Sequence, residues 1–578
     1  MINLRSSYFF FFIIFIYFFS LNYFQSYHQH WTSLADQDPV IIYNSLLIAS
    51  GFDQEYRDHP AYSTFLVLGG VYKFLSLFFD NFNLEQVFKS ENIDKNFQNL
   101  FYIARFLNTF YLFLSSYLIY RILQELNIKK IISVVSVLIF TFFLASYEVL
   151  YLLRSEILSI LLFLFSIYYF LKAINSSKAF YIILTGIFFC FSMLAKIQII
   201  FLYFILIISI PFIINYLKLE KNTSINLINK NYNFKLSLFI VSLFIIFFFS
   251  YHIFIGVIYF KQTKSLLFSL NNNLDFYFFS LFIIFYCSLI AILSKKKLAD
   301  VNLIVFSISL ILVGFILAVG LILILDLLNI IPVHPSIFLR IMSPIEFMNM
   351  HTIKSNIELV NIWTSIKELF LIGLYDLGYD FNSFYDPKIL AIKNRVFFRL
   401  LYIILLLIMF LSFLKKVKNE NINHLVIVFF LGVIIYFSIL TIRETHGYNL
   451  YLIPLYLFIF SLLLNNLNKN YLLVFSLLFS FIVIFENYSF KTIHKNAFVR
   501  EPRIHHICHI KNWRNSSNYF YNNLFSLHVP FVGGNALGDW FGKYLDQFYG
   551  NDKVLLKYCE QLNKYTNDEI KFYFPKSN

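Results

Sequence analysis

Charged residues, glycine and proline are all scarce in this chain. Only 13% of its 578 residues are Asp, Glu, Lys or Arg, which is about half of the share usual in soluble globular proteins. It has only 16 Gly and 11 Pro, which excludes collagen-like and Pro-rich disordered chains. Hydrophobic residues make up 59%, with 76 Phe and 41 Tyr, more than a soluble fold of this size could bury. The composition therefore indicates a polytopic membrane protein.

Cysteine is scarce too. The chain has four cysteines, and their spacing to one another and to His is not that of a zinc site. Cys190 and Cys287 lie in apolar segments, where we expect inert packing residues. Cys508 and Cys559 lie in the polar C-terminal tail, and in an oxidising compartment they could form a disulfide.

Thirteen apolar runs are long enough to be membrane spans, which need about 20 residues with some latitude for tilt. They are 8–25, 102–121, 131–150, 155–173, 179–195, 197–217, 236–259, 275–293, 301–331, 396–414, 424–442, 448–465 and 471–486. A further apolar stretch, 61–79, is shorter and contains Gly69, Gly70 and Lys73. We interpret it as a helix that lies in the membrane interface.

The distribution of Lys and Arg orients these spans. With the N-terminus in the cytoplasm, the inside segments hold about seventeen Lys and Arg and the short outside loops about five. This bias also accounts for the net charge of +14 without a nucleic-acid partner. The first helix is too long and too rich in Phe for a signal peptide and lacks a cleavage site, so we expect an uncleaved anchor.

The predicted fold is thus all-α, with about 13 transmembrane helices, the N-terminus inside and the C-terminus outside. Residues 1–486 form the membrane domain, and 487–578 form a small extracytoplasmic domain. Two large outer loops, 25–99 and 331–395, interrupt the membrane domain.

The first outer loop carries an acidic pair at the membrane surface, Asp36 and Asp38. A carboxylate held at such a boundary can have its pKa tuned and can act as a general base. For Asp36 the alternative is a solvated loop acid. For Asp38 the alternative is a helix N-cap, because Pro39 suits the first turn of a short helix.

Further ionisable side chains fall near the outside ends of the predicted helices. They are Arg57, His59, Glu148, Arg154, Glu156, Lys196, Arg443 and His446. Cations there can bind a lipid phosphate through charge-assisted hydrogen bonds. Lys196 interrupts the apolar run 188–204, where a lysine is costly and by default a functional candidate. The alternatives are structural: headgroup contacts, an Arg154–Glu156 pair, and snorkelling of Lys196.

The order of these motifs resembles the integral-membrane glycosyltransferases of the GT-C fold. Members include the protein O-mannosyltransferases, the lipid A aminoarabinose transferase and the bacterial lipopolysaccharide-core glycosyltransferases. The resemblance rests on Asp36-Gln37-Asp38, the helix from Tyr43 to Gly51, His59-Pro60, Arg105, Arg154-Ser155-Glu156, Lys196, and Arg443 with Tyr448 and Pro454. It covers residues 1–220 better than the rest. Gln37 stands where the family has its second acid, and Ala61 where a second proline follows His-Pro.

The resemblance implies an inverting glycosyltransferase of the bacterial inner membrane, with its active site facing the periplasm. It would move a hexose or pentose from a polyprenyl-phosphate donor to lipopolysaccharide, a glycolipid or a protein. Asp36 would be the general base, with Asp38 positioning it or helping to hold a metal. Arg57, Lys196 and Arg443 would stabilise the leaving lipid phosphate. Some relatives use a divalent cation and others do not, and no ligand cluster in the sequence decides the matter.

Two other functions stay open at this point. A flippase or transporter for lipid-linked sugars would place ionisable groups near helix centres and use broken helices. Asp326 is the only buried-looking acid in a span interior, and it could equally cap a helix end. An O-antigen ligase or polymerase would use the large loop 331–395 in place of Asp36.

Overall fold

A computed structural model describes most of the first 344 residues and part of the remainder. The described residues are 4–23, 38–52, 54, 61–79, 82, 93–143, 146, 149–150, 153–221, 234–263, 274–296, 300–333, 336–344, 403–411, 414, 420–441, 449–466 and 474–483. Within these ranges all regular secondary structure is helical and there is no strand. The all-α class predicted from the sequence is confirmed.

The main helices occur along the chain in the following order. They are α1 (Leu4–Leu21), α2 (Asp38–Ala49), α3 (Tyr62–Leu75), α5 (Ile93–Glu125), α6 (Lys130–Phe142), α8 (Ser155–Ser176), α9 (Ala179–Ala195), the short 3₁₀ turn η4 (Ile197–Ile199), α10 (Ile200–Lys221), α11 (Phe234–Thr263), α13 (Leu274–Lys295), α14 (Val301–Leu327), α15 (Ser336–Met342), α19 (Glu420–Thr441) and α20 (Asn449–Asn466).

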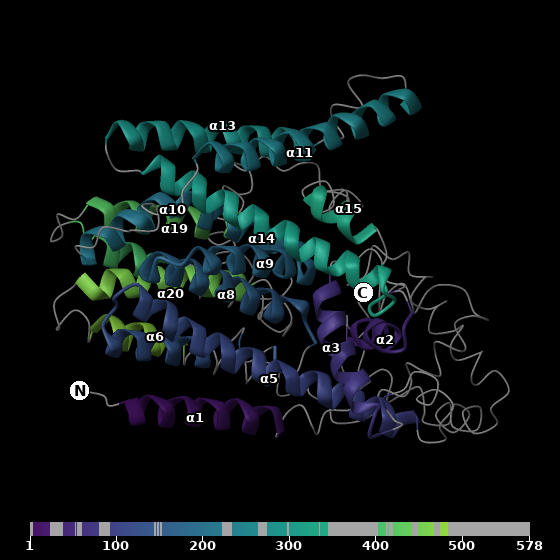
Figure 1. Ribbon diagram of the computed structural model, residues 1–578. Coiled ribbons are helices and arrows are strands. Elements are labelled where there is room, and N and C mark those ends of the chain that lie inside the picture. The colour runs from purple at the N-terminus through teal and green to yellow at the C-terminus, as the bar shows by residue number, and fades with distance from the viewer. Residues whose placement is uncertain are drawn as a thin grey trace, which may run out of the picture.

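The long helices run side by side and form one bundle (Figure 1). Helix α8 lies in its interior, where it packs against α5 on one side and α9 on the other. Helix α9 also packs against α14. Helix α10 packs against α19, α19 against α20, and α20 against α6. Helix α1 lies at the edge of the bundle against α5. The interior is a continuous core of Leu, Ile, Phe and Val.

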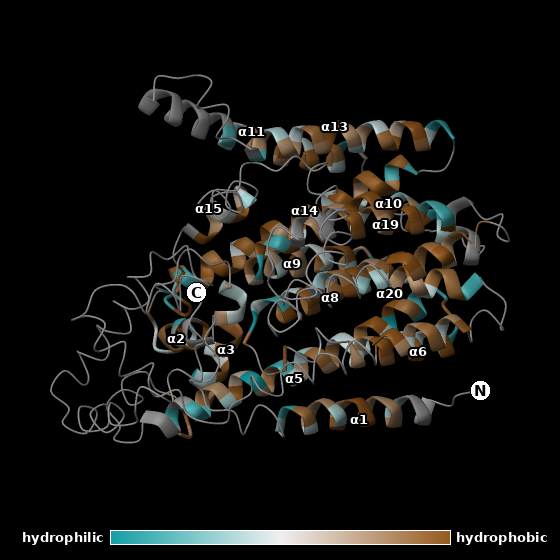
Figure 2. Ribbon diagram, turned by 180° about the vertical axis from the view of Figure 1, so that it is seen from behind, coloured by the Kyte–Doolittle hydropathy of each residue, from teal (hydrophilic) through white to brown (hydrophobic). Residues whose placement is uncertain are grey.

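Helices α11 and α13 lie at the opposite edge of the bundle and are apolar along most of their length (Figure 2). They leave many large hydrophobic side chains exposed, including Phe239, Phe247, Leu281 and Phe285. An apolar surface of this extent is stable only in contact with lipid or another apolar partner. The arrangement is that of a membrane protein whose peripheral helices expose apolar side chains to the surrounding lipid.

Six helices in the described part of the chain are long and apolar enough to cross a membrane. They are Gln98–Glu125, Ser155–Ser176, Ile197–Leu217, Lys235–His252, Asp275–Lys295 and Val301–Leu327. Each of the other seven predicted ranges also contains described helix, but in shorter pieces. The structure therefore supports a polytopic membrane protein, and the count of thirteen spans stays a prediction.

Two short helices of the predicted first outer loop, α2 and α3, lie across one end of the bundle (Figure 1). The short helix predicted after Pro39 is confirmed as α2. It ends where Gly51 takes the left-handed conformation (φ 83°), and the N–H groups of Gly51 and Phe52 donate to the carbonyls of Ile48 and Leu47. This is a Schellman ending, which glycine adopts without steric strain. Helix α3 has 14 residues, too few to span a bilayer.

Three side chains of α3 hold it against the ends of three other segments. The Tyr62 hydroxyl donates to the Pro332 carbonyl after α14 (3.2 Å), and the Ser63 hydroxyl donates to the Phe191 carbonyl of α9 (2.7 Å). The Tyr72 hydroxyl donates to a carbonyl near the start of α5 (2.9 Å). Burial raises the pKa of Tyr72 well above its usual value, so this hydroxyl stays protonated and remains a donor. Helix α3 is therefore fixed at the end of the bundle.

The adjacent glycines of α3 predict opposite effects of the same substitution. A Cβ at Gly69 would lie 2.8 Å from the Ser45 carbonyl oxygen of α2, whereas one at Gly70 would meet nothing within 4 Å. We expect Gly69→Ala to separate α2 from α3 and to cost about 1–3 kcal/mol. Gly70→Ala should be neutral or stabilising by up to about 1 kcal/mol. Thermal unfolding of both variants in detergent tests this, and equal midpoints would contradict the close contact.

Candidate functional site

Two helix ends meet beneath α3. Helix α8 begins at Ser155 after Arg154, whose backbone is extended, and α9 ends at Ala195 before Lys196, whose backbone is also extended. The helices are antiparallel neighbours. The first turn of α8 and the end of α9 therefore lie side by side. This places Glu156, in the first turn of α8, next to Lys196.

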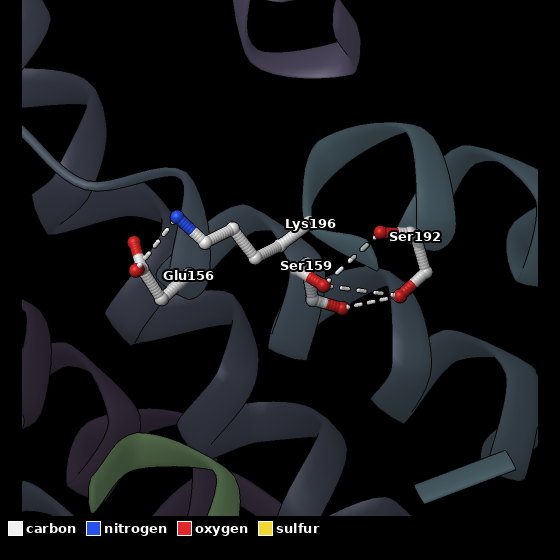
Figure 3. A network of polar contacts seen from close by, with 4 residues as sticks. All are labelled: Glu156, Ser159, Ser192 and Lys196. Atoms are coloured by element: carbon white, nitrogen blue, oxygen red, sulfur yellow. Dashed lines mark hydrogen bonds and ion pairs between the residues drawn. The ribbon is translucent and has the colours of Figure 1, made fainter. Parts of the chain in front are cut away.

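Lys196 and Glu156 form a buried ion pair (Figure 3). The Lys196 Nζ lies 3.1 Å from the Glu156 Oε1, and the two side chains are 3% and 2% exposed. Each charge also suits the helix end that it occupies, because a carboxylate is stabilised near a helix N-terminus and an ammonium near a C-terminus. A buried pair of this kind is strongly destabilised when one partner is removed.

Two serines fix the register of α8 against α9 directly below the ion pair. The Ser159 hydroxyl donates to the Ser192 carbonyl (3.1 Å), and the Ser192 hydroxyl donates to the Ser159 carbonyl (2.7 Å). The same Ser192 carbonyl accepts from the backbone N–H of Lys196 (3.0 Å). Small hydroxyl residues let helix backbones approach closely, so α8 and α9 are held together at Ser159 and Ser192. This reciprocal contact fixes the position of the Lys196 backbone relative to Glu156 (Figure 3).

Arg154 adds a second cation to the pair. Its side chain is 9% exposed, and it lies close enough to Glu156 to interact electrostatically with the carboxylate. The second carboxylate oxygen, Oε2, has no hydrogen-bond partner among the described residues. The described part of the cluster therefore combines two cations, which can attract a phosphate, with a carboxylate oxygen that can accept a hydrogen bond from a hydroxyl.

The predicted first outer loop adjoins this cluster. The Ser63 hydroxyl of α3 donates to the Phe191 carbonyl of α9, five residues before Lys196. Asp38 begins α2, which packs along α3. The loop that carries the predicted acidic pair thus leads into α2, which packs on α3, and α3 contacts the end of α9.

The structure describes only part of the site predicted from the sequence. Glu156 and Lys196 are brought into contact, with Arg154 beside them. For Asp38 the structure describes only the backbone, at the start of α2. The remaining predicted residues lie outside the described residues: Asp36, Arg57, His59, Glu148, Arg443 and His446. Cys508 and Cys559 lie outside them as well.

Sequence reasoning paired Glu156 with Arg154 as a structural alternative, and it missed the contact with Lys196. It also missed Ser159 and Ser192, although Ser192 lies four residues before Lys196 and so faces the same side of α9. A search for small polar residues one turn from an intramembrane charge could have found both serines.

The structure also describes the surroundings of two other charged residues in the predicted spans. The resemblance places Arg105 at the start of a span, but it lies well inside α5, because this helix already begins at Ile93. It is fully buried, with its guanidinium 5.2 Å from the centre of the Phe101 ring. The carboxylate of Asp326 accepts from the backbone N–H of Val333 (2.9 Å) and orders the turn that follows α14, which is the capping role foreseen for it.

No group of three or more His, Cys, Asp or Glu side chains that could hold a metal ion occurs in the part of the chain that the structure describes. Comparisons with protein-family models, with curated proteins and with solved structures found no match to this chain.

Proposed function

We propose that this protein is a membrane glycosyltransferase that moves a sugar from a polyprenyl-phosphate donor to an extracytoplasmic acceptor, with inversion. The observation that carries the proposal is the buried Lys196–Glu156 pair, with Arg154 beside it, beneath the helices of the first outer loop. In this proposal the chain has thirteen spans and a cytoplasmic N-terminus. The cluster then faces the periplasm of a bacterial inner membrane.

The proposed roles follow from the chemistry of sugar transfer. As the bond between the sugar and the lipid phosphate breaks, negative charge develops on the departing phosphate. Fixed cations in a site of low dielectric stabilise such charge more than water does. Lys196 and Arg154 supply two cations, and Arg57 and Arg443 would add to them. Glu156 holds Lys196 in place through Oε1 and can accept a sugar hydroxyl through Oε2.

Asp36 is the proposed general base. It would take the proton from the acceptor hydroxyl as that oxygen attacks the anomeric carbon of the sugar, and Asp38 would position it. The proton ends on Asp36, the sugar on the acceptor and the electron pair of the broken bond on the lipid phosphate. The balance requires no oxidant and no reductant.

Replacing Asp36 with asparagine tests the proposal. A general base contributes about 10²–10⁴-fold to a rate, so we expect Asp36→Asn to lose transfer by this factor while the protein still inserts in the membrane. The readout is mass analysis of cell-surface glycans and lipopolysaccharide with the gene deleted, restored, or restored as the variant. Deletion should remove a single sugar, and Asp36→Asn should reproduce that loss.

The matched control is Asp53→Asn, in the same loop, which should leave the glycan unchanged. Full glycan with Asp36→Asn would remove Asp36 from the reaction. Glycans unaltered by deletion of the gene would contradict the proposed transfer itself.

A further inference from the structure

A second charged cluster lies at the opposite end of the bundle, where α5 and α8 end and α9 begins. It contains Arg121 of α5 and Lys172 of α8. Lys172 is separated from Glu156 by 16 residues of one helix, or about 24 Å along its axis. The cluster is therefore distinct from the candidate active site.

Tyrosines surround both cations. The guanidinium of Arg121 lies 5.9 Å from the ring centre of Tyr117 and 5.7 Å from that of Tyr168. Its Nη1 and Nη2 donate to the hydroxyls of the same two tyrosines, at 3.1 and 3.4 Å. The Lys172 ammonium lies 5.4 Å from the ring centre of Tyr168 and 4.7 Å from that of Tyr181. Tyr168 therefore contacts both cations.

Neither cation has a carboxylate within ion-pair distance among the described residues. The acid closest to them in the chain, Glu125, attracts the Arg121 guanidinium from beyond that distance and accepts a hydrogen bond from the Asn175 Nδ2 (2.6 Å). Two cations and one carboxylate leave a net positive charge. Cation–π contacts stabilise a cation but do not neutralise its charge. The cluster thus keeps a positive charge beside several hydroxyl groups that can donate or accept hydrogen bonds.

A series of stacked aromatic rings leads away from the cluster toward the middle of the bundle. Tyr181 stacks on Tyr169 (5.8 Å between ring centres, 18° between planes), Tyr169 on Phe188 (5.5 Å, 5°) and Phe188 on Phe165 (5.0 Å, 16°). All four rings are partly exposed along α8 and α9. They form a continuous apolar track of stacked rings that begins at the ring contacting Lys172.

The site has two parts, a positive cluster with hydroxyl groups around it and an apolar track along the helices. They match the two parts of a phospholipid, its charged headgroup and its acyl chain. Basic pockets between helix ends bind anionic lipid headgroups. We propose that Arg121, Lys172 and the surrounding tyrosine hydroxyls bind the phosphate of an anionic phospholipid, whose acyl chain lies along the track from Tyr181 to Phe165. The lipid belongs to the leaflet at this end of the bundle. The proposal does not depend on glycosyl transfer at the other end.

Lipid retention by the full-length purified protein tests the site. Phosphatidylglycerol and phosphatidylcholine with the same acyl chains are added in detergent, and binding is followed by native mass spectrometry and by thermal unfolding. We expect the wild-type chain to retain and be stabilised by phosphatidylglycerol only. Each cation contributes about 1 kcal/mol near a charged surface, so Arg121→Gln/Lys172→Gln should weaken binding about tenfold or more.

The matched control is Lys130→Gln, an exposed lysine at the same end of the bundle, which should bind as the wild type does. If the double variant does not fold, Tyr168→Phe replaces it, because it removes a hydroxyl and keeps the ring; weaker retention of phosphatidylglycerol is then expected. Retention unchanged in these variants, or equal retention of phosphatidylcholine, would overturn the proposal. Inorganic phosphate that displaces the lipid and gives the same stabilisation would instead show a free-anion site.

Discussion

Lys196→Met is expected to destabilise the folded protein by about 3 kcal/mol, the lower end of the range for breaking a buried ion pair. The variant leaves the Glu156 carboxylate buried at a helix end without the ammonium that lies 3.1 Å from it. Arg154, nearby, offsets part of that loss, which is why we expect the lower end. Thermal or denaturant unfolding in detergent measures the effect, and sugar transfer should be lost with it.

The double variant Lys196→Met/Glu156→Gln separates stability from function. Replacing both partners of a buried pair by neutral groups is often nearly neutral for stability, because no uncompensated charge remains. We therefore expect the double variant to regain most of the unfolding midpoint. If Lys196 stabilises a departing phosphate, the double variant nevertheless stays inactive.

A third variant serves as the reference for both measurements. Lys178→Met removes an exposed lysine that precedes α9 at the other end of the same helix, and it should match the wild type in stability and transfer. A double variant that is both stable and active would assign the ion pair a purely structural role. The proposed transfer would then have to rest on the outer-loop acids alone.

Gly314→Ala is expected to cost about 3 kcal/mol, at the upper end of typical overpacking costs. Helices α9 and α14 cross with their backbones in contact. A Cβ added at Gly314 would overlap the Ile183 carbonyl and lie 3.0 Å from the Cα of Gly186, and one added at Gly186 would overlap the Ile311 carbonyl. These neighbours are backbone atoms of packed helices, so they cannot avoid the added Cβ by a change of rotamer, as a side chain could.

Gly320→Ala is the control, since it makes the same change in the same helix where a Cβ meets nothing within 4 Å. It should be neutral or stabilising by roughly 0.5–1 kcal/mol, because alanine favours the helix over glycine. Unfolding midpoints of the two variants in the same detergent test the difference. Similar midpoints would mean that α9 and α14 do not cross at these glycines.

Gly314→Ala should also affect transfer. The end of α14 leads to Pro332, which accepts the Tyr62 hydrogen bond of α3. A change in the spacing of α9 and α14 would therefore shift α3 relative to Lys196. We expect reduced transfer even at temperatures where the variant stays folded.

Much of the fold could be predicted from the sequence because its determinants are local. Apolar runs of membrane-spanning length, separated by short polar turns, predicted helices, and each run contains one in the structure, although the helix within 131–150 already ends at Phe142. Pro39 and Gly51 correctly predicted the short helix α2 at the start of the first outer loop. The run 61–79 was too short to span, and α3 is indeed a short helix across the end of the bundle. Lys196 stood out because an ammonium within an apolar run is costly wherever it lies.

The sequence by itself determined that this chain is an all-helical membrane protein and that a few ionisable residues sit at its helix ends. Only the tertiary structure decided which of these meet: Glu156 with Lys196, 40 positions apart, through a register that Ser159 and Ser192 set. The closeness of α9 and α14 at Gly186 and Gly314 was likewise decided by packing. The physical reason is that transfer of apolar surface out of water is non-directional and fixes only which segments become membrane helices. Close packing, pairwise polar contacts and the fit of small residues fix which helix faces touch.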